Sequence, residues 1–179
     1  MELLQVHDKM FSPFIDAHTI QQKVCEIGHQ IAKDYEGLDP LFIVILNGSF
    51  MFAADIFKTI NIPAEISFIK LASYKGTTST GNVITAIGMD ENLTGRHIVI
   101  LEDIIDSGKT LHSFLPEIWQ RHPASVKIAV FLSKPTALQY DIKPHYHCFE
   151  IPDDFVVGYG LDYDGLGRNL PALYTLADQ

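Results

Sequence analysis

Two kinds of hydrophobic pattern alternate along the chain. Short segments rich in apolar residues predict six strands, over residues 41–46, 64–71, 83–87, 97–101, 126–132 and 145–151. The apolar runs at 41–46 and 98–101 are unbroken, as is typical of strands buried on both faces. Apolar residues three or four positions apart predict helices over 17–34 after a cap at Asp16, through residue 60 after the first strand, and from Lys109 onwards. Pro116 lacks an N–H donor and should kink or shorten the third helix. Because strands alternate with helices, the sequence predicts an α/β fold with a mostly parallel central sheet flanked by helices.

Length and composition narrow the class of protein. The 179 residues are 47% hydrophobic, so we expect a single domain over residues 1–179. The net charge of −9 argues against a nucleic-acid partner, because binding a phosphate backbone requires clustered Lys and Arg. Only two cysteines occur, Cys25 and Cys148, which we interpret as core residues, and the amino terminus shows no secretory h-region. We therefore expect a cytoplasmic protein with no nucleic-acid or membrane partner.

One segment, Ile98 to Leu111, joins a buried strand to a helix through acids and hydroxyls. Glu102 and Asp103 at the end of the strand suit ribose hydroxyls or a hydrated Mg²⁺ ion. The helix that opens at Gly108 offers free backbone N–H groups, which can bind an anion over residues 106 to 110. A phosphate at one end and hydroxyls at the other describe a ribose 5-phosphate.

Two other interpretations of this segment are weaker. Gly108-Lys109-Thr110 reproduces the end of a Walker A loop, but that motif needs a glycine where this chain has Asp103, and an acid there would repel a phosphate. The segment could also be an ordinary strand and turn with solvated acids. The adjacent acids and the helix-opening Ser-Gly-Lys-Thr would then occur together only by chance. A sugar-phosphate site is the favoured interpretation.

The same segment resembles the phosphoribosyl pyrophosphate (PRPP) binding motif of type I phosphoribosyltransferases. The further segments that match are Leu46-Asn47-Gly48-Ser49, Ser73-Tyr74-Lys75-Gly76, Lys134-Pro135, Phe155 to Tyr163 and Arg168-Asn169-Leu170. Their order and spacing are similar to the 6-oxopurine branch, the hypoxanthine or hypoxanthine-guanine phosphoribosyltransferases, across nearly the whole chain. This resemblance implies a type I phosphoribosyltransferase fold with a small hood formed by the chain ends, and residues of about 150–179 contributing to the hood over the purine.

The resemblance also implies roles for individual residues at the PRPP end. The PRPP and 5-phosphate residues would be Glu102, Asp103, Asp106, Ser107, Gly108, Lys109 and Thr110. The pyrophosphate residues would be Leu46, Asn47, Gly48 and Arg168. Many relatives carry Lys or Arg at the position of Asn47, and an amide cannot neutralise a phosphate, so Arg168 and Mg²⁺ are expected to supply the charge.

Other positions would serve the purine, the metal and a lid. The purine residues would be Lys134, Phe155, Val156 and Asp162, and the Mg²⁺ ligands Glu102, Asp103 and Asp162. Lys134 would donate to the purine 6-oxo group, which disfavours adenine. Ser73 and Tyr74 would belong to a flexible lid that excludes water from the reacting sugar.

The implied reaction is transfer of the 5-phosphoribosyl group from PRPP to N9 of hypoxanthine, and of guanine, with release of pyrophosphate. Asp106 is the candidate base for the proton on purine N7. A homodimer or homotetramer is expected from the resemblance. The alternatives left open are an enzyme that prefers xanthine and a PRPP-sensing regulator of the same fold that binds nucleic acid. The acidic composition argues against the regulator.

Overall fold

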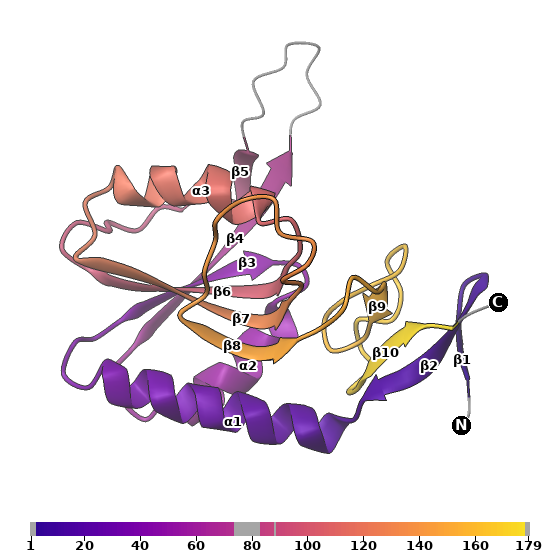
Figure 1. The fold of residues 1–179 in the computed structure, drawn as a ribbon. Helices are drawn as coiled ribbons and strands as arrows, with labels where there is room; N and C mark the ends of the chain where they lie inside the picture. The colour runs from indigo at the N-terminus through magenta and orange to yellow at the C-terminus, as the bar shows by residue number, and fades with distance from the viewer. Residues whose placement is uncertain (1–2, 74–82, 88, 178–179) are drawn as a thin grey trace, which may run out of the picture.

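The computed structural model describes residues 3–73, 83–87 and 89–177, shown in Figure 1. The helices are α1 (Ala17–Asp34), α2 (Phe50–Thr59) and α3 (Lys109–Trp119). The strands are β1 (Leu4–Val6), β2 (Lys9–Ile15), β3 (Leu41–Leu46), β4 (Glu65–Ser73), β5 (Val83–Ile87), β6 (His97–Ile105), β7 (Ser125–Ser133), β8 (Tyr146–Glu150), β9 (Val156–Val157) and β10 (Leu173–Leu176).

Six of these strands form a central sheet in the order β5-β4-β3-β6-β7-β8. The strands β4, β3, β6, β7 and β8 run parallel, and β5 is an antiparallel strand at one edge. In a parallel sheet the carboxyl ends of the strands meet at one edge, where ligands collect. The order places β6, with its acids, between β3 and β7.

Helices cover both faces of the central sheet, α1 and α2 on one and α3 on the other (Figure 1). The alternating side chains of β3 explain this arrangement, since Phe42 and Val44 pack with α1 and α2 while Ile43 and Ile45 pack with α3. All four are buried, as expected for a strand between two helical layers. The predicted mostly parallel sheet flanked by helices is confirmed.

A smaller antiparallel sheet lies beside the carboxyl edge of the central sheet, in the order β1-β2-β10-β9 (Figure 1). It brings the two chain ends together, because β10 near the carboxyl terminus pairs with β2 near the amino terminus. We call this sheet, with the loop from residue 158 to residue 172 that joins β9 to β10, the hood. The sequence pattern predicted none of its four strands, although the resemblance implied a hood formed by the chain ends.

The predicted elements differ from the observed ones in three further respects. β6 continues to Ile105, so Glu102 and Asp103 belong to the strand itself and do not follow it. α3 runs through Pro116 and ends three residues later at Trp119. Cys148 is buried as predicted, but Cys25 is only half-buried, because it lies on the flank of α1. No helix in the described ranges is long and apolar enough to span a membrane.

Tyr159 in the hood loop forms a hydrogen bond to α2. Its side chain is 1% exposed, and its hydroxyl donates to Asp55 Oδ2 on α2 at 2.7 Å. Gln21 and Lys58 donate to the same carboxylate at 2.7 and 2.8 Å. Burial opposes ionisation of Asp55, but the hydrogen bonds from Lys58, Tyr159 and Gln21 together hold its pKa below the ordinary value. The ring of Tyr159 also packs 4.6 Å from that of Phe131 on β7.

We expect Tyr159→Phe to lower the free energy of unfolding by about 1.5–3 kcal/mol, the usual range for a hydrogen bond to a charged group. Because the pKa of Asp55 is lowered in the folded state, the loss should be full at neutral pH and shrink as the pH falls below about 4. Urea unfolding at neutral pH and at a pH below about 4 measures this loss of stability. Tyr174→Phe is the control, since the Tyr174 hydroxyl makes no hydrogen bond within the described residues, and an equal loss there would contradict the assignment.

Candidate functional site

The carboxyl end of β6 and the start of α3 enclose a cavity of about 210 Å³, lined by residues 102 to 111. Gly108 joins the two elements with φ of +80°, a left-handed conformation that glycine adopts without strain. The carbonyl oxygen of Ser107 accepts from the backbone N–H groups of Gln139 and Tyr140 at 3.0 and 3.2 Å, which fixes the turn. The predicted 5-phosphate residues therefore surround one cavity at the amino end of a helix, a position that favours an anion.

Two adjacent carboxyl groups, those of Glu102 and Asp103, line this cavity. Glu102 is 6% exposed, and its Oε2 has no hydrogen-bond partner among the described residues. Burial, and secondly the neighbouring Asp103, raises the pKa of Glu102 well above its ordinary value. Burial also raises the pKa of Asp103 to about 6, although the backbone N–H of Ile104 acts in the opposite direction. An orphaned carboxylate oxygen beside a second acid fits a hard cation that takes oxygen ligands.

The loop after β3 lies directly against Asp103. A Cβ atom on Gly48 would lie 1.5 Å from Asp103 Oδ2, so only glycine leaves room for the carboxylate. A Cβ atom on Gly160, in the hood loop, would lie 2.0 Å from the carbonyl oxygen of Gly48. The Leu46–Asn47 peptide bond, immediately before this contact, is cis. The Asp103 side chain and the backbone of the hood loop thus meet at Gly48, although they come from distant parts of the sequence.

Arg168 and Asp162 form an ion pair at the same place. Arg168 Nη2 lies 2.6 Å from Asp162 Oδ1, and Arg168 Nη1 donates to the carbonyl oxygen of Gly160 at 2.6 Å. The backbone N–H of Gly165 donates to the other oxygen of Asp162 at 2.7 Å. The only predicted pyrophosphate residue with a positive charge is therefore adjacent to a predicted metal ligand.

A second cavity, of about 250 Å³, lies between the carboxyl edge of the sheet and the hood. It shares its wall with the first cavity, and its lining residues are Asp103, Ile104, Asp106, Lys134, Phe155, Val156, Leu161 and Asp162. This set contains all four of the predicted purine residues. The structure brings them beside Asp106, the candidate base.

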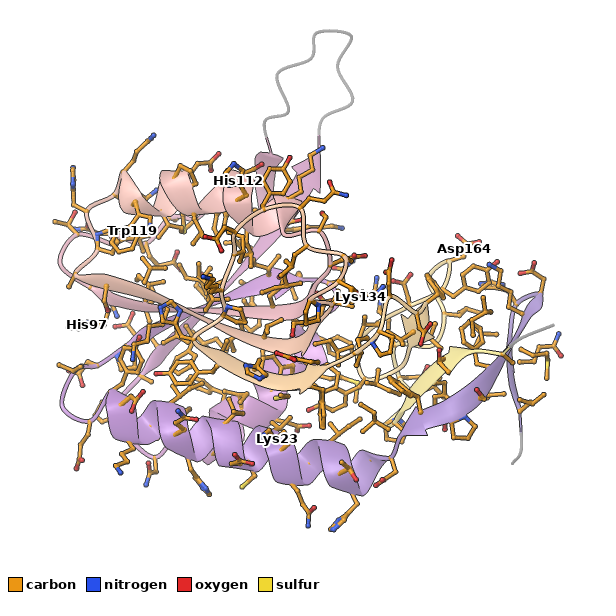
Figure 2. The ribbon with its side chains drawn as sticks, in the orientation of Figure 1. Lys23, His97, His112, Trp119, Lys134 and Asp164 are labelled. Carbon is orange, nitrogen blue, oxygen red and sulfur yellow. The ribbon has the colours of Figure 1, made fainter. Side chains whose placement is uncertain are left out.

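Lys134 is the one buried cation of the described residues. It follows β7 directly, is 7% exposed, and lies between the sheet edge and the hood (Figure 2). Its Nζ is 3.2 Å from Asp153 Oδ1 and 3.7 Å from Asp106 Oδ2. Asp153 was not predicted from the sequence, where nothing but its acidic side chain distinguishes it.

The hood supplies an aromatic wall to this cavity. The ring of Phe155 is 44% exposed and stands edge-on to Tyr163, with centroids 5.8 Å apart. Lys9 on β2 places its Nζ 4.7 Å from the Tyr163 centroid, a cation–π contact, and Asp8 accepts a hydrogen bond from the Tyr163 hydroxyl at 2.8 Å. Sequence reasoning missed both Lys9 and Asp8, which come from the far end of the chain.

The predicted lid residues are not placed at the site. Ser73 is the last residue of β4, and only its backbone is described. Tyr74 lies outside the described residues. Their role remains a prediction.

The chain is similar to known proteins over most of its length. Residues 14–164 match the model of a phosphoribosyl transferase domain. A hypoxanthine-guanine phosphoribosyltransferase of Streptococcus thermophilus is 40% identical over 161 residues, which cover 89% of each chain. A crystal structure of a hypoxanthine-guanine phosphoribosyltransferase from Bacillus anthracis, with HEPES in its active site, is 38% identical, with a TM-score of 0.87 over 93% of this chain and 98% of that one. A hypoxanthine phosphoribosyltransferase from Staphylococcus aureus gives a TM-score of 0.88 at 38% identity, over 93% and 91% of the two chains.

The raised pKa of Asp103 predicts that this residue destabilises the metal-free protein. Because the folded state holds the proton up to about pH 6 and the unfolded state only to about pH 4, stability falls as the pH rises between these values. Asp103→Asn should therefore raise the free energy of unfolding in the presence of EDTA at pH 8, by up to about 3 kcal/mol, and the gain should vanish near pH 4.

Urea unfolding at both pH values checks this. Asp141→Asn is the control, because the side chain of Asp141 is 86% exposed and its replacement removes the same charge. A gain for Asp103→Asn that is equally large at pH 4 would contradict the titration.

Proposed function

Since this chain belongs to the phosphoribosyl transferase family, and within it to the enzymes of the hypoxanthine-guanine type, we propose that it transfers the 5-phosphoribosyl group of PRPP to N9 of hypoxanthine and guanine. The products would be IMP or GMP and pyrophosphate. The observation that carries this proposal is the pair of adjoining cavities that share Asp103 and Asp106. One has the chemistry for a ribose 5-phosphate and the other for a 6-oxopurine.

The first cavity suits the ribose 5-phosphate end of PRPP. Its helix start at Lys109 and Thr110 offers N–H groups and the positive end of a helix dipole to the phosphate. The carboxylates of Glu102 and Asp103 can accept hydrogen bonds from the ribose hydroxyls. The pyrophosphate would extend toward Gly48 and Arg168, where Arg168 supplies the positive charge that the exposed Asn47 lacks.

The second cavity suits a 6-oxopurine. The buried ammonium of Lys134 donates hydrogen bonds and never accepts them, so it pairs with a carbonyl at C6 and not with an amino group. The exposed face of Phe155 offers a surface for stacking on the base. Hypoxanthine, guanine and xanthine differ only at C2, which the experiment below resolves.

The acids of the first cavity fit Mg²⁺. No three His, Cys, Asp or Glu side chains of the described residues are grouped closely enough to hold a metal by themselves. We propose Glu102 and Asp103, with Asp162 from the second cavity, as the side chains that would hold it, because Glu102 has an unpartnered buried oxygen and Mg²⁺ prefers carboxylate ligands. When bound, the ion would screen the negative charge of the departing pyrophosphate.

The protein side chains would then align the two reactants. Lys134 orients the base through its 6-oxo group, and α3 anchors the 5-phosphate, so that N9 faces C1 of the ribose. The bond from C1 to pyrophosphate breaks as the bond from C1 to N9 forms on the opposite face. Asp106, at the boundary of the two cavities, accepts the proton from N7.

Purified protein with PRPP and Mg²⁺ should convert hypoxanthine, guanine or both in an absorbance assay, and should not convert adenine. Each base is offered separately, with xanthine as the fourth. Turnover of xanthine in preference to the other two would replace the proposed substrate. The absence of turnover with any of the four bases would contradict the proposed reaction.

Asp106→Asn should lower kcat on the order of a hundredfold, because a positioned general base contributes about this much. The dissociation constant for PRPP, measured by calorimetry, should change little, since Asn keeps the shape of the side chain. An unchanged kcat would show that another group takes the proton. A large loss of PRPP binding would place Asp106 in substrate binding instead.

A further inference from the structure

The ammonium group of Lys134 is shared between two carboxylates with different positions in the fold. Asp106 lines both cavities, whereas Asp153 lines neither of them. Asp153 is nevertheless the nearer partner, at 3.2 Å against 3.7 Å for Asp106. The shorter of the two contacts of Lys134 is therefore made by a residue outside both cavities.

The chain places Asp153 opposite Lys134 through the main sheet. β7 and β8 are parallel neighbours, with Ser133 paired to Glu150 at their carboxyl ends. The backbone N–H of Ile151 continues this pairing by donating to the carbonyl oxygen of Ser133 at 2.9 Å. Lys134 and Asp153 thus follow neighbouring strands at the same edge of the sheet, Lys134 directly and Asp153 three residues after the end of β8.

A buried lysine needs such a partner for a physical reason. The side chain is a flexible four-carbon chain that loses about 2 kcal/mol of rotamer entropy when it is fixed, and a buried ammonium without acceptors is strongly disfavoured. The ammonium has three N–H donors. One of them is donated to Asp153 at 3.2 Å, whereas Asp106 at 3.7 Å lies beyond hydrogen-bond distance, so donors remain for a ligand in the purine cavity.

We propose that Asp153 is a positioning residue that holds the Lys134 ammonium away from Asp106 and directs it to the purine 6-oxo group. This inference rests on the proposed function. Without the Asp153 carboxylate, the Lys134 ammonium would move from 3.7 Å to hydrogen-bond distance of Asp106, its one remaining acidic partner. That contact would withdraw the donor from the 6-oxo group and neutralise the base in an ion pair.

The test compares Asp153→Asn with the wild-type enzyme. We expect the KM for hypoxanthine to rise on the order of tenfold, the effect of weakening one charge-assisted hydrogen bond, while the KM for PRPP stays the same. Asp153→Glu should restore most of the hypoxanthine affinity. Purine itself, which lacks the 6-oxo group, should inhibit the variant and the wild type equally, a result that a merely structural role for Asp153 would not produce.

Asp154→Asn is the matched control. It removes the same charge from the adjacent position, and Asp154 makes no ion pair within the described residues. Its KM for hypoxanthine should equal that of the wild type. An increase equal to that of Asp153→Asn would overturn the proposal, because it would show an effect of loop charge and not of the Lys134 contact.

A double-mutant cycle supplies the second test. In a Lys134→Met background the additional change Asp153→Asn should have no further effect on the KM for hypoxanthine, since the group it positions is gone. Additive effects would overturn the proposal, as would an unchanged hypoxanthine KM in Asp153→Asn alone. If the wild-type enzyme itself did not use hypoxanthine, the proposed function would fail and not merely the role of Asp153.

Thermal unfolding excludes a trivial cause. The Asp153 side chain is 66% exposed, so Asp153→Asn should unfold within a few degrees of the wild type, as is usual for surface substitutions. A variant that melted far below this would show that Asp153 holds the fold and not one side chain, and that result would also overturn the proposal.

Discussion

The adjacent carboxyl groups of Glu102, which is buried, and Asp103, which is half-buried, lie at the carboxyl end of β6 and are the constraint around which the site is arranged. Removing two acids from water costs several kcal/mol per ionised group. The strand that carries them is held on both sides by parallel neighbours, and its apolar residues pack into two cores. The absence of a side chain at Gly48 leaves room for the Asp103 carboxylate. The stable part of the fold thus supports an electrostatically unfavourable edge.

The hood lines the site on the side opposite the carboxyl edge of the central sheet. It is fastened to the helical layer by the hydroxyl of Tyr159, and its own sheet joins the two chain ends through β2 and β10. Lys9 from the amino-terminal hairpin packs over Tyr163, which in turn supports Phe155 in the purine cavity. The position of a ring in the site therefore depends on residues from both ends of the sequence.

What the sequence could predict was determined by how local each interaction is. Residues 41–46 form an unbroken apolar run, and Asp16 caps the helix before it by accepting from the backbone N–H of Thr19, so these elements were found where they lie. The hood strands were missed because β2 contains Pro13 and pairs with a strand near the other terminus, which gives no local signal. Motif residues around Asp103 could be recognised from their order. The contact of Lys134 with Asp153 could not, since it depends on the register of β7 and β8.

The backbone contact at Gly48 also bears on how such a site can change over generations. The main chain there is confined by Asp103 and by Gly160, but the preceding side chain, Asn47, is exposed to solvent. Residue 48 therefore cannot carry a larger side chain, whereas residue 47 can be substituted. Natural variation at residue 47 can then alter the charge presented to a leaving group while the framework that aligns the reactants stays the same. Single substitutions at residue 47 can therefore change the affinity for a polyanion during evolution without disrupting the fold.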